Sequence, residues 1–345
     1  MSEQPAAPRI DRRIGVTVLT GFLGSGKTTL LNRLVKDPAY ADTAVIINEF
    51  GTIGVDHHLV RHADARIVAL EGGCICCTVN GDLVHALRDL FMMALRRQIK
   101  PLRRVLIETT GLASPAPILF TLRHEPFLAE RYVHAGTLAV VDASHIARQL
   151  LDQPEAAQQV ALADLVVCAK PDLVDQDALS HALDAVAQVH PGVAMCVQWP
   201  DAALDRRLAP GEPLPLRVAG GSWSVGLAGL AGLSGGSRHP RVSQVVIDLP
   251  HALSRAAFLT GMAQVQQAHH QGLLRIKGVI GFAGESVPCA VHGVHRDLYP
   301  PEPLAGWPAG LAQSRLVCIV RDLDPGVLQA SLRQALRQPP GASAH

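Results

Sequence analysis

An eight-residue glycine-rich string near the amino terminus constrains the fold more than any other feature. Residues 21–28 are Gly-Phe-Leu-Gly-Ser-Gly-Lys-Thr, which meets the pattern G-x-x-x-x-G-K-[ST]. The string follows the β-branched run of residues 16–20 and precedes a helical pattern at residues 29–35. In such a strand–loop–helix unit, backbone N–H groups and the amino terminus of the helix surround phosphate oxygens. The string therefore predicts a phosphate-binding loop, in preference to a glycine-rich turn that binds nothing.

The residue types in this loop have distinct expected roles. Its glycines let the backbone turn so that successive N–H groups point at phosphate oxygens. Lys27 is expected to contact the β- and γ-phosphates of a nucleotide, and the Thr28 hydroxyl to bind Mg²⁺. The expected nucleotide-binding residues of the loop are Gly21, Gly24, Ser25, Gly26, Lys27, Thr28 and Thr29.

A carboxylate ends another apolar strand pattern further along the chain. Residues 105–107 are Val-Leu-Ile, and Glu108-Thr-Thr-Gly111 follows them. An acid in this place suits the Mg²⁺ side of a bound nucleotide, and the Gly111 N–H suits the γ-phosphate. We therefore predict that Glu108 joins Lys27 and Thr28 in the catalytic group. The alternative is a charged strand end followed by an ordinary turn.

A weaker pattern concerns the base of the nucleotide. Residues 166–172 are Val-Val-Cys-Ala-Lys-Pro-Asp, which matches the guanine-reading pattern [N/T]-K-x-D at Lys170 and Asp172. There the Asp accepts hydrogen bonds from guanine that adenine cannot offer, and the Lys stem lies over the purine ring. Ala169 stands where an Asn or Thr is usual. We expect guanine preference to survive with weakened affinity, against the alternative of an unselective site.

The chain of 345 residues is too long for one ordinary core, so we expect two domains. Up to about residue 200, strand and helix patterns alternate, which predicts an α/β domain with a mostly parallel sheet and helices on both faces. The expected strands are 15–19, 44–47, 66–70, 105–107, 137–141, 165–168 and 193–197. The expected helices of this domain are 27–35, 82–97 and 178–189.

A change in composition after residue 200 marks a boundary, because prolines and then Gly-Gly-Ser and Ser-Gly-Gly strings accumulate there. A small α+β C-terminal domain follows, with expected strands at 242–249, 274–282, 289–293 and 316–321 and expected helices at 254–271 and 325–336. The predicted division is a disordered N-terminus (1–13), a nucleotide-binding domain (14–200), a linker (201–241), the small domain (242–337) and a disordered tail (338–345).

Three cysteines crowd into one short loop pattern after the third expected strand. Cys74, Cys76 and Cys77 form a Cys-x-Cys-Cys string. Thiolates are soft ligands that zinc, copper(I) or cobalt(II) accept. Three sulfurs are too few for a closed four-ligand cage, so the site suits a metal that is handed over. The candidates for a fourth ligand are Glu49 and the pair His57–His58, and the alternative is three buried apolar cysteines.

Composition excludes some classes of partner. Lys and Arg number 31 against 30 Asp and Glu, for a net charge of +1, so there is no electrostatic case for a nucleic acid or an anionic membrane. No run reaches the roughly 18 apolar residues of a spanning helix. The polar start lacks the apolar stretch of a signal peptide. These features predict a cytoplasmic protein, where clustered cysteines serve thiolate chemistry rather than disulfides.

The motifs together resemble the CobW-like metallochaperone GTPases, relatives of HypB and UreG. The resemblance is carried by residues 20–31, by Asn48-Glu-Phe-Gly51, by Gly73-Cys-Ile-Cys-Cys77 and by Glu108-Thr-Thr-Gly111, and by landmarks such as Leu274-Arg-Ile-Lys-Gly278 in the small domain. It implies a slow P-loop GTPase that needs GTP and Mg²⁺, binds Zn²⁺ or Co²⁺ and delivers it to a client metalloprotein. By position, the nucleotide roles fall to Lys27, Thr28, Glu49, Glu108, Lys170 and Asp172, and the metal to Cys74, Cys76 and Cys77.

This sequence departs from the family pattern in three places. Thr52 stands where many members carry a glutamate, Ile47 stands where some do, and the His-rich stretch often found between the domains is missing. Two other functions stay open, the first of them on the basis of Ala169. One is a metal-buffering or client-binding module with weak nucleotide turnover. The other is a dedicated activator of one metalloenzyme, such as a nitrile hydratase or a cobalamin-pathway enzyme. The partners expected are a client protein and, as an open alternative, a second copy of the chain.

Overall fold

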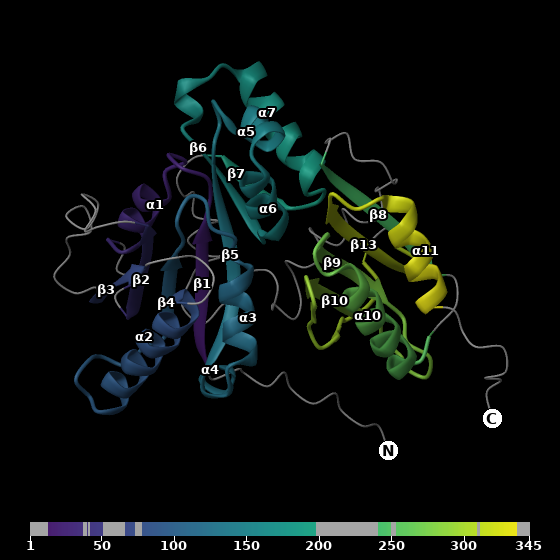
Figure 1. The fold of residues 1–345 in the computed structure, drawn as a ribbon, viewed down its shortest axis with the longest axis horizontal. Helices are drawn as coiled ribbons and strands as arrows, with labels where there is room; N and C mark the ends of the chain where they lie inside the picture. Colours follow the sequence, from purple (N-terminus) through teal and green to yellow (C-terminus); the bar gives the residue numbers. More distant parts are fainter. Residues whose placement is uncertain are drawn as a thin grey trace.

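The computed structural model describes residues 13–36, 40, 42–50, 66–72, 78–197, 241–249, 253–308 and 311–336, and only the backbone at 48–50, 66–72 and 78–81. The disordered N-terminus, the linker and the disordered tail that the sequence predicts lie almost wholly outside these residues. The predicted fold class is confirmed. A parallel sheet with helices is followed by a C-terminal domain built on an antiparallel sheet (Figure 1).

Seven parallel strands form the first sheet, in the order β3-β2-β4-β1-β5-β6-β7. They read as nearly continuous apolar runs because both faces of a parallel sheet are covered; in β4 and β6, for example, every residue is buried. The strands are β1 (Ile14–Thr20), β2 (Thr43–Phe50), β3 (Arg66–Gly72), β4 (Arg104–Glu108), β5 (Tyr132–Asp142), β6 (Leu165–Ala169) and β7 (Ala194–Val197).

Helices cover both faces of this sheet. Helix α1 packs through Leu30, Leu31 and Leu34 on one face, and the other helices pack on the opposite face. The helices of this domain are α1 (Lys27–Leu34), α2 (Thr78–Leu95), α3 (Ala116–His124), α4 (Pro126–Arg131), α5 (Ile146–Asp152), α6 (Pro154–Leu162) and α7 (Gln176–Val189), with a 3₁₀ turn η3 at Pro171–Leu173.

The sequence patterns missed the four helices α3 to α6. Each is only six to nine residues long, so each shows little periodicity. A proline stands at the start of α3, α4 and α6, where its fixed φ angle suits the first helical turn and its missing N–H costs nothing. In these three places proline begins a helix.

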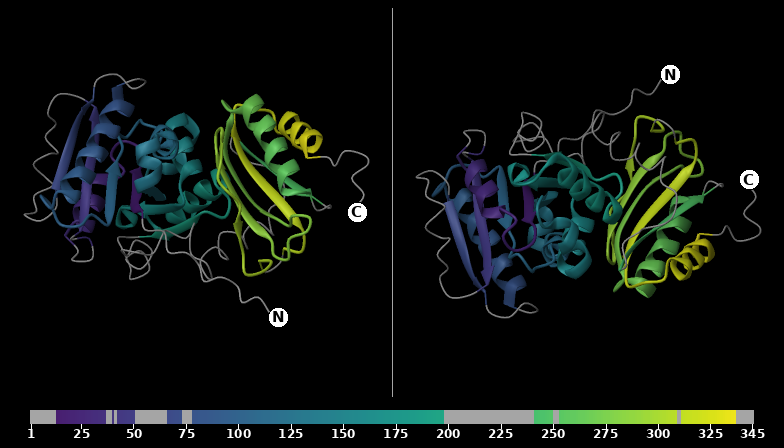
Figure 2. Two further views of the ribbon diagram at one scale, coloured as in Figure 1. Left: turned by 90° about the horizontal axis from the view of Figure 1, so that it is seen from below. Right: turned by 90° about the horizontal axis from the view of Figure 1, so that it is seen from above.

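The C-terminal domain is a five-stranded antiparallel path, β11-β10-β9-β13-β8, with β12 paired to β10. Two helices pack on one face of the sheet, around Phe258, Met262 and Leu332. Figure 2 shows both helices on the side turned away from the first domain. The elements are β8 (Val242–Leu249), α10 (Arg255–His269), β9 (Leu273–Ile280), β10 (Cys289–Val294), β11 (Asp297–Leu298), β12 (Glu302–Pro303), β13 (Ser314–Arg321) and α11 (Pro325–Ala335). The short strands β11 and β12 were not predicted.

A buried ion pair joins the two domains. Arg275 in β9 binds the carboxylate of Asp164 and donates to the Leu162 carbonyl at 2.6 Å, while the Thr137 N–H donates to the same carboxylate at 2.9 Å. Burial works to raise the pKa of Asp164, but the Arg275 charge and the Thr137 N–H hold it below its ordinary value. Burial lowers the pKa of the neighbouring Lys277 to about 7.

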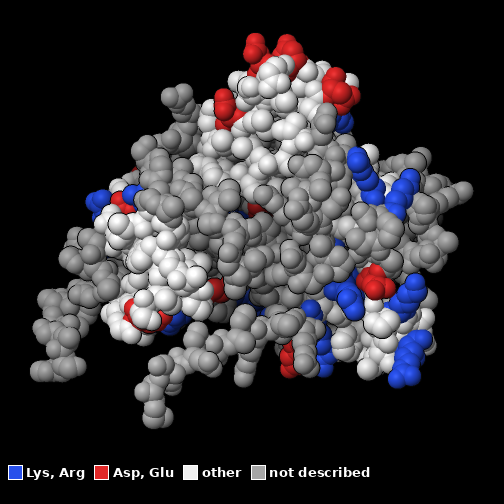
Figure 3. Space-filling view, turned by 180° about the vertical axis from the view of Figure 1, so that it is seen from behind, with Lys and Arg blue, Asp and Glu red and all other residues white. Residues whose placement is uncertain are grey.

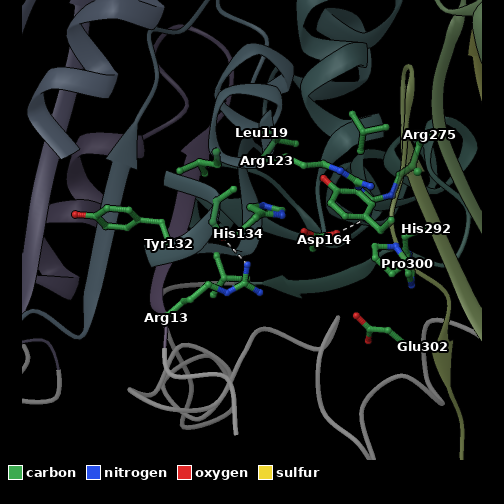
Figure 4. A pocket seen from close by; sticks show the side chains of 16 residues that line it. Arg13, Leu119, Arg123, Tyr132, His134, Asp164, Arg275, His292, Pro300 and Glu302 are labelled. Atoms are coloured by element: carbon green, nitrogen blue, oxygen red, sulfur yellow. Dashed lines mark hydrogen bonds and ion pairs between the residues drawn. The ribbon is translucent and has the colours of Figure 1, made fainter. Parts of the chain in front are cut away.

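A cavity of about 260 Å³ lies beside this ion pair, between the domains (Figure 4). Arg123 and His134 line it from the first domain, and His292 and Glu302 line it from the second.

Charged side chains on the surface are unevenly spread. Figure 3 shows acidic side chains gathered at the upper end of the molecule, where α7 lies, and basic ones along the lower right. The net charge of +1 therefore combines regions of opposite sign.

Candidate nucleotide and metal site

The phosphate loop connects the end of β1 to the start of α1. Gly21, Gly24 and Gly26 have φ angles of +142°, +73° and +101°. A Cβ on Gly21 would lie 2.2 Å from the Val140 carbonyl oxygen, so only glycine fits there. Gly26 is the N-cap of α1, and no side chain caps this helix. The first N–H groups of α1 thus remain for an anionic ligand.

The polar side chains of the loop also favour an anionic ligand. Lys27 is 8% exposed, and its ammonium donates to the Phe22 carbonyl at 3.2 Å. Burial lowers the pKa of Lys27, against the opposing charge of Glu108. The Ser25 hydroxyl is buried and has no hydrogen-bond partner within the described residues. A buried cation and an unsatisfied hydroxyl on one loop are the groups that phosphate oxygens would satisfy.

Glu108 lies directly against the phosphate loop. The Thr28 hydroxyl donates to the Glu108 carboxylate at 2.7 Å, although 80 residues separate them in the chain. Their meeting follows from the sheet, because β1 and β4 are parallel neighbours with Leu19 opposite Glu108. The sequence-predicted catalytic residues Lys27, Thr28 and Glu108 therefore lie together. A hydroxyl and a carboxylate in contact are the oxygen ligands that Mg²⁺ accepts beside phosphates.

The segment after Glu108 packs closely onto the phosphate loop. The Thr109 N–H donates to the Leu19 carbonyl at 2.9 Å, and the Thr109 hydroxyl donates to the Thr20 hydroxyl at 3.0 Å. A Cβ on Gly111 would lie 2.7 Å from the Leu23 nitrogen, which is backbone of the phosphate loop. Glycine at position 111 is thus required for this approach, and the structure places it beside the loop as the sequence analysis expects.

The base-side residues are also connected to the phosphate loop. Lys170 has a φ of +55°, and its ammonium donates to the Gly24 carbonyl at 2.8 Å and to Asp142 at 2.7 Å. Asp172 lies exposed in η3. Ala169 is fully buried in an apolar cluster at the end of β6. Because its side chain is a methyl group, Ala169 offers no hydrogen bond to a base.

Asp142 is a site residue that sequence reasoning missed. It is 5% exposed and accepts hydrogen bonds from Lys170 and from the Ser144 hydroxyl at 2.5 Å. Burial acts to raise the pKa of Asp142, and the bonds from Lys170 and Ser144 bring it below its ordinary value. Its position at the end of an apolar strand pattern could have indicated Asp142 as a candidate. Asp142 ends the apolar strand β5 just as Glu108 ends β4.

Two family models match this chain and together cover most of it. The CobW/HypB/UreG nucleotide-binding domain matches residues 15–197, and the cobalamin synthesis protein cobW C-terminal domain matches residues 242–336. The chain belongs to the CobW/HypB/UreG family. The resemblance inferred from the motifs is thereby confirmed.

Individual relatives agree with this assignment. The zinc chaperone YjiA of Escherichia coli is 39% identical over 168 residues, which are 49% of this chain and 52% of that protein. The zinc chaperone CobW of Pseudomonas aeruginosa is 28% identical over 97% of this chain and 95% of its own length. The crystal structure of Zn(II)-bound YjiA GTPase from E. coli has a TM-score of 0.68 and 23% identity, and covers 95% of this chain and all of that one. That likeness shows a shared fold.

Thr29 lies in α1, and the predicted metal ligands of this family member fall outside the described part. Cys74, Cys76 and Cys77 lie outside the described residues, as do His57 and His58, and only the backbone of Glu49 is described. The two strands that precede these residues in the chain, β2 and β3, are described. Strands β2 and β3 are parallel to β1 and β4, so their carboxyl ends reach the sheet edge that carries the phosphate loop.

Two further features are absent from the described residues. No group of three or more His, Cys, Asp or Glu side chains in the described ranges could hold a metal ion. None of the helices that the structure describes is both long and apolar enough to cross a membrane.

Proposed function

We propose that this chain is a GTP-hydrolysing metallochaperone that carries a transition metal, zinc in first place, to a client metalloprotein. The observation that carries the GTPase half is the 2.7 Å hydrogen bond between Thr28 and Glu108, formed beside the buried ammonium of Lys27. This contact between the phosphate loop and the acid at the end of β4 supports the proposal that both serve a nucleotide with Mg²⁺. Bound Mg²⁺ would neutralise charge on the β- and γ-phosphates.

The chain's own residues divide the work of hydrolysis. The ammonium of Lys27 and the N–H groups at the start of α1 bind phosphate oxygens. The Thr28 hydroxyl and the Glu108 carboxylate would hold the cation. The N–H of Gly111 would face the γ-phosphate from the segment that packs on the phosphate loop. Each of these groups acts by position and charge, which is how most catalysis of phosphoryl transfer arises.

The proposed base preference is for guanine, through Asp172. A carboxylate that reads two donors rejects a base without them by about 10⁴-fold in favourable cases. We expect a smaller ratio here, because Ala169 is buried and Asp172 is exposed. Competition of GTP and ATP for a fluorescent GDP analogue measures the ratio, and Asp172→Asn should reduce it. Equal affinities for both nucleotides would contradict the assignment of the base site.

The proposed metal half rests on Cys74, Cys76 and Cys77, and the printed names of relatives support it. Zinc is favoured because YjiA and the P. aeruginosa CobW are both named zinc chaperones. Cobalt is the second candidate, since thiolates accept it as well. The proposal places the chain in the cytoplasm, where reducing conditions keep these cysteines as thiols.

Phosphate release measured with and without Zn²⁺ tests the proposal against its rival. A metal-buffering or client-binding module would bind zinc but release phosphate no faster than a buffer blank. The buried Ala169 is the observation that favours this rival. The dedicated activator differs only in its client. It is distinguished by transfer of zinc from the GTP-loaded chain to one purified apo-metalloenzyme and to no other.

A further inference from the structure

A buried glutamine in α6 reaches the segment that follows Glu108. Gln159 is only 1% exposed. Its side-chain nitrogen donates to the Gly111 carbonyl at 3.1 Å and to the Ala113 carbonyl at 3.0 Å. Both carbonyls lie more than 40 residues away in the chain, so no feature of the local sequence indicates this contact.

The two carbonyls determine how the Gln159 amide is oriented. Turning the amide round would place its oxygen against two carbonyl oxygens, which cannot donate. Both N–H groups are therefore used, and the Gln159 oxygen is buried with no hydrogen-bond partner among the residues that the structure describes. An unsatisfied buried oxygen costs stability. A methionine of similar length would fill the same space without this cost, so packing alone does not account for a glutamine here.

The segment that Gln159 holds is the one that faces the phosphate site. Gly111 is pressed on one side against the backbone of Leu23 in the phosphate loop. On the other side its carbonyl is held by Gln159. Gln159 also lines a narrow crevice together with Gly21 and Phe22 of the same loop. The Gly111 residue is thus contacted both by the phosphate loop and by Gln159.

Helix α6 is itself anchored, which makes it a firm support. The His190 ring contacts the Val160 carbonyl at 3.0 Å. From the C-terminal domain, Arg275 donates to the Leu162 carbonyl at 2.6 Å and Arg321 donates to Gln158 at 3.2 Å. The side chain of Gln159 therefore extends from a helix that both domains hold in place.

From this geometry we infer that Gln159 is a positioning residue for GTP hydrolysis. It holds the Gly111 carbonyl and so restrains this residue, whose N–H, in the preceding peptide, would meet the γ-phosphate; it touches neither the nucleotide nor the cation. The inference rests on the proposed GTPase function. GDP has no γ-phosphate for Gly111 to contact. Gln159 should therefore affect binding and hydrolysis of GTP while leaving GDP affinity nearly unchanged.

The test compares Gln159→Met with Gln158→Glu, a change at its neighbour on the same helix that keeps the oxygen accepting from Arg321. Multiple-turnover phosphate release gives kcat, and titrations with fluorescent GDP and with a non-hydrolysable GTP analogue give two affinities. We expect Gln159→Met to lower kcat about tenfold, as the loss of two hydrogen bonds implies, and to weaken the analogue. GDP affinity should stay within about twofold, since GDP makes none of the lost contact. Gln158→Glu should match the wild type in all three measurements, because its carboxylate still accepts from Arg321.

A second variant covers the case in which Gln159→Met does not fold. Gln159→Leu removes both donors without burying a charge, and circular dichroism reports whether each variant is folded. Wild-type kcat in a folded variant would overturn the inference. Equal loss of affinity for GDP and for the analogue would overturn it as well, because it would indicate a general structural effect. A wild-type chain that releases no phosphate would instead refute the proposed function itself.

Discussion

The ammonium of Lys170 lies 2.7 Å from the carboxylate of Asp142 and 2.8 Å from the carbonyl of Gly24. A single side chain thus connects the end of β5, the start of η3 and the tip of the phosphate loop. Asp142 is buried, and Lys170 is about a third exposed. The carboxylate therefore restricts the position of the one lysine expected to lie over the purine ring.

Replacing Asp142 should weaken nucleotide binding. Asp142→Asn removes the charge that holds Lys170, and we expect GDP and GTP affinity to fall about threefold to tenfold, because solvent screens part of this pair. Titration with a fluorescent GDP analogue measures the change. Asp184→Asn, on the exposed side of α7, serves as the matched control. Unchanged affinity in Asp142→Asn would show that Lys170 needs no partner.

Lys27→Ala should abolish hydrolysis and leave the fold intact. Lys27 is the cation of the phosphate loop, and removing one group that stabilises developing charge typically costs at least about 100-fold in rate. Stability should not suffer, because burial already disfavours the charged form of this lysine. Phosphate release measures the rate, and thermal unfolding measures the stability. Hydrolysis near the wild-type rate would remove the central assignment.

Lys277 should make stability depend on pH between about 7 and 10. Burial lowers its pKa to about 7 in the folded chain, whereas the unfolded chain keeps the ordinary value near 10.5. Between these values the unfolded state binds more protons, so this group makes the free energy of unfolding increase as pH rises. Urea unfolding at pH 7, 8, 9 and 10 measures the slope. Lys277→Met should be more stable at pH 7 and should show a smaller slope, and equal slopes in both proteins would contradict the prediction.

Zinc binding should need Cys76 and at least one of Cys74 and Cys77. Thiolates lose protons when they bind metal, so binding should release protons and weaken as pH falls. Competition with a chelating dye measures affinity in the triple Cys→Ser variant. The control is Cys196→Ser, which changes a partly buried cysteine of β7. Unchanged affinity in the triple variant would place the metal elsewhere, and His57 and His58 would be examined next.

GTP and the metal should raise each other's affinity. The ends of β2 and β3 reach the sheet edge of the phosphate loop, and a γ-phosphate can order such loops. If ordering completes the metal site, linkage requires equal factors for both ligands, typically 5–150-fold. Metal titrations of the apo chain, the GDP form and the form with a non-hydrolysable GTP analogue measure this factor. Identical affinities in all three states would contradict a GTP-driven delivery cycle.

Local patterns predicted the elements whose physics is local. The glycines of residues 21–28 are required by backbone angles and close approaches inside one loop. Glu108 was recognisable because an apolar strand ends in it. The main strands of both sheets were predicted because burial on both faces leaves a continuous apolar run, and burial on one face leaves an alternation of apolar and polar residues. The short helices α3 to α6 leave no such trace, since a single turn or two carries too few apolar positions.

The amino-acid sequence by itself determined the family, the phosphate loop and the order of the two domains, because each depends on neighbours in the chain. Tertiary structure alone decided which distant groups meet. Asp142 with Lys170, Gln159 with Gly111, and Arg275 with Asp164 are pairs separated by 28, 48 and 111 residues. Whether such side chains meet depends on strand order and on how the helices pack, and a pattern of neighbouring residues records neither.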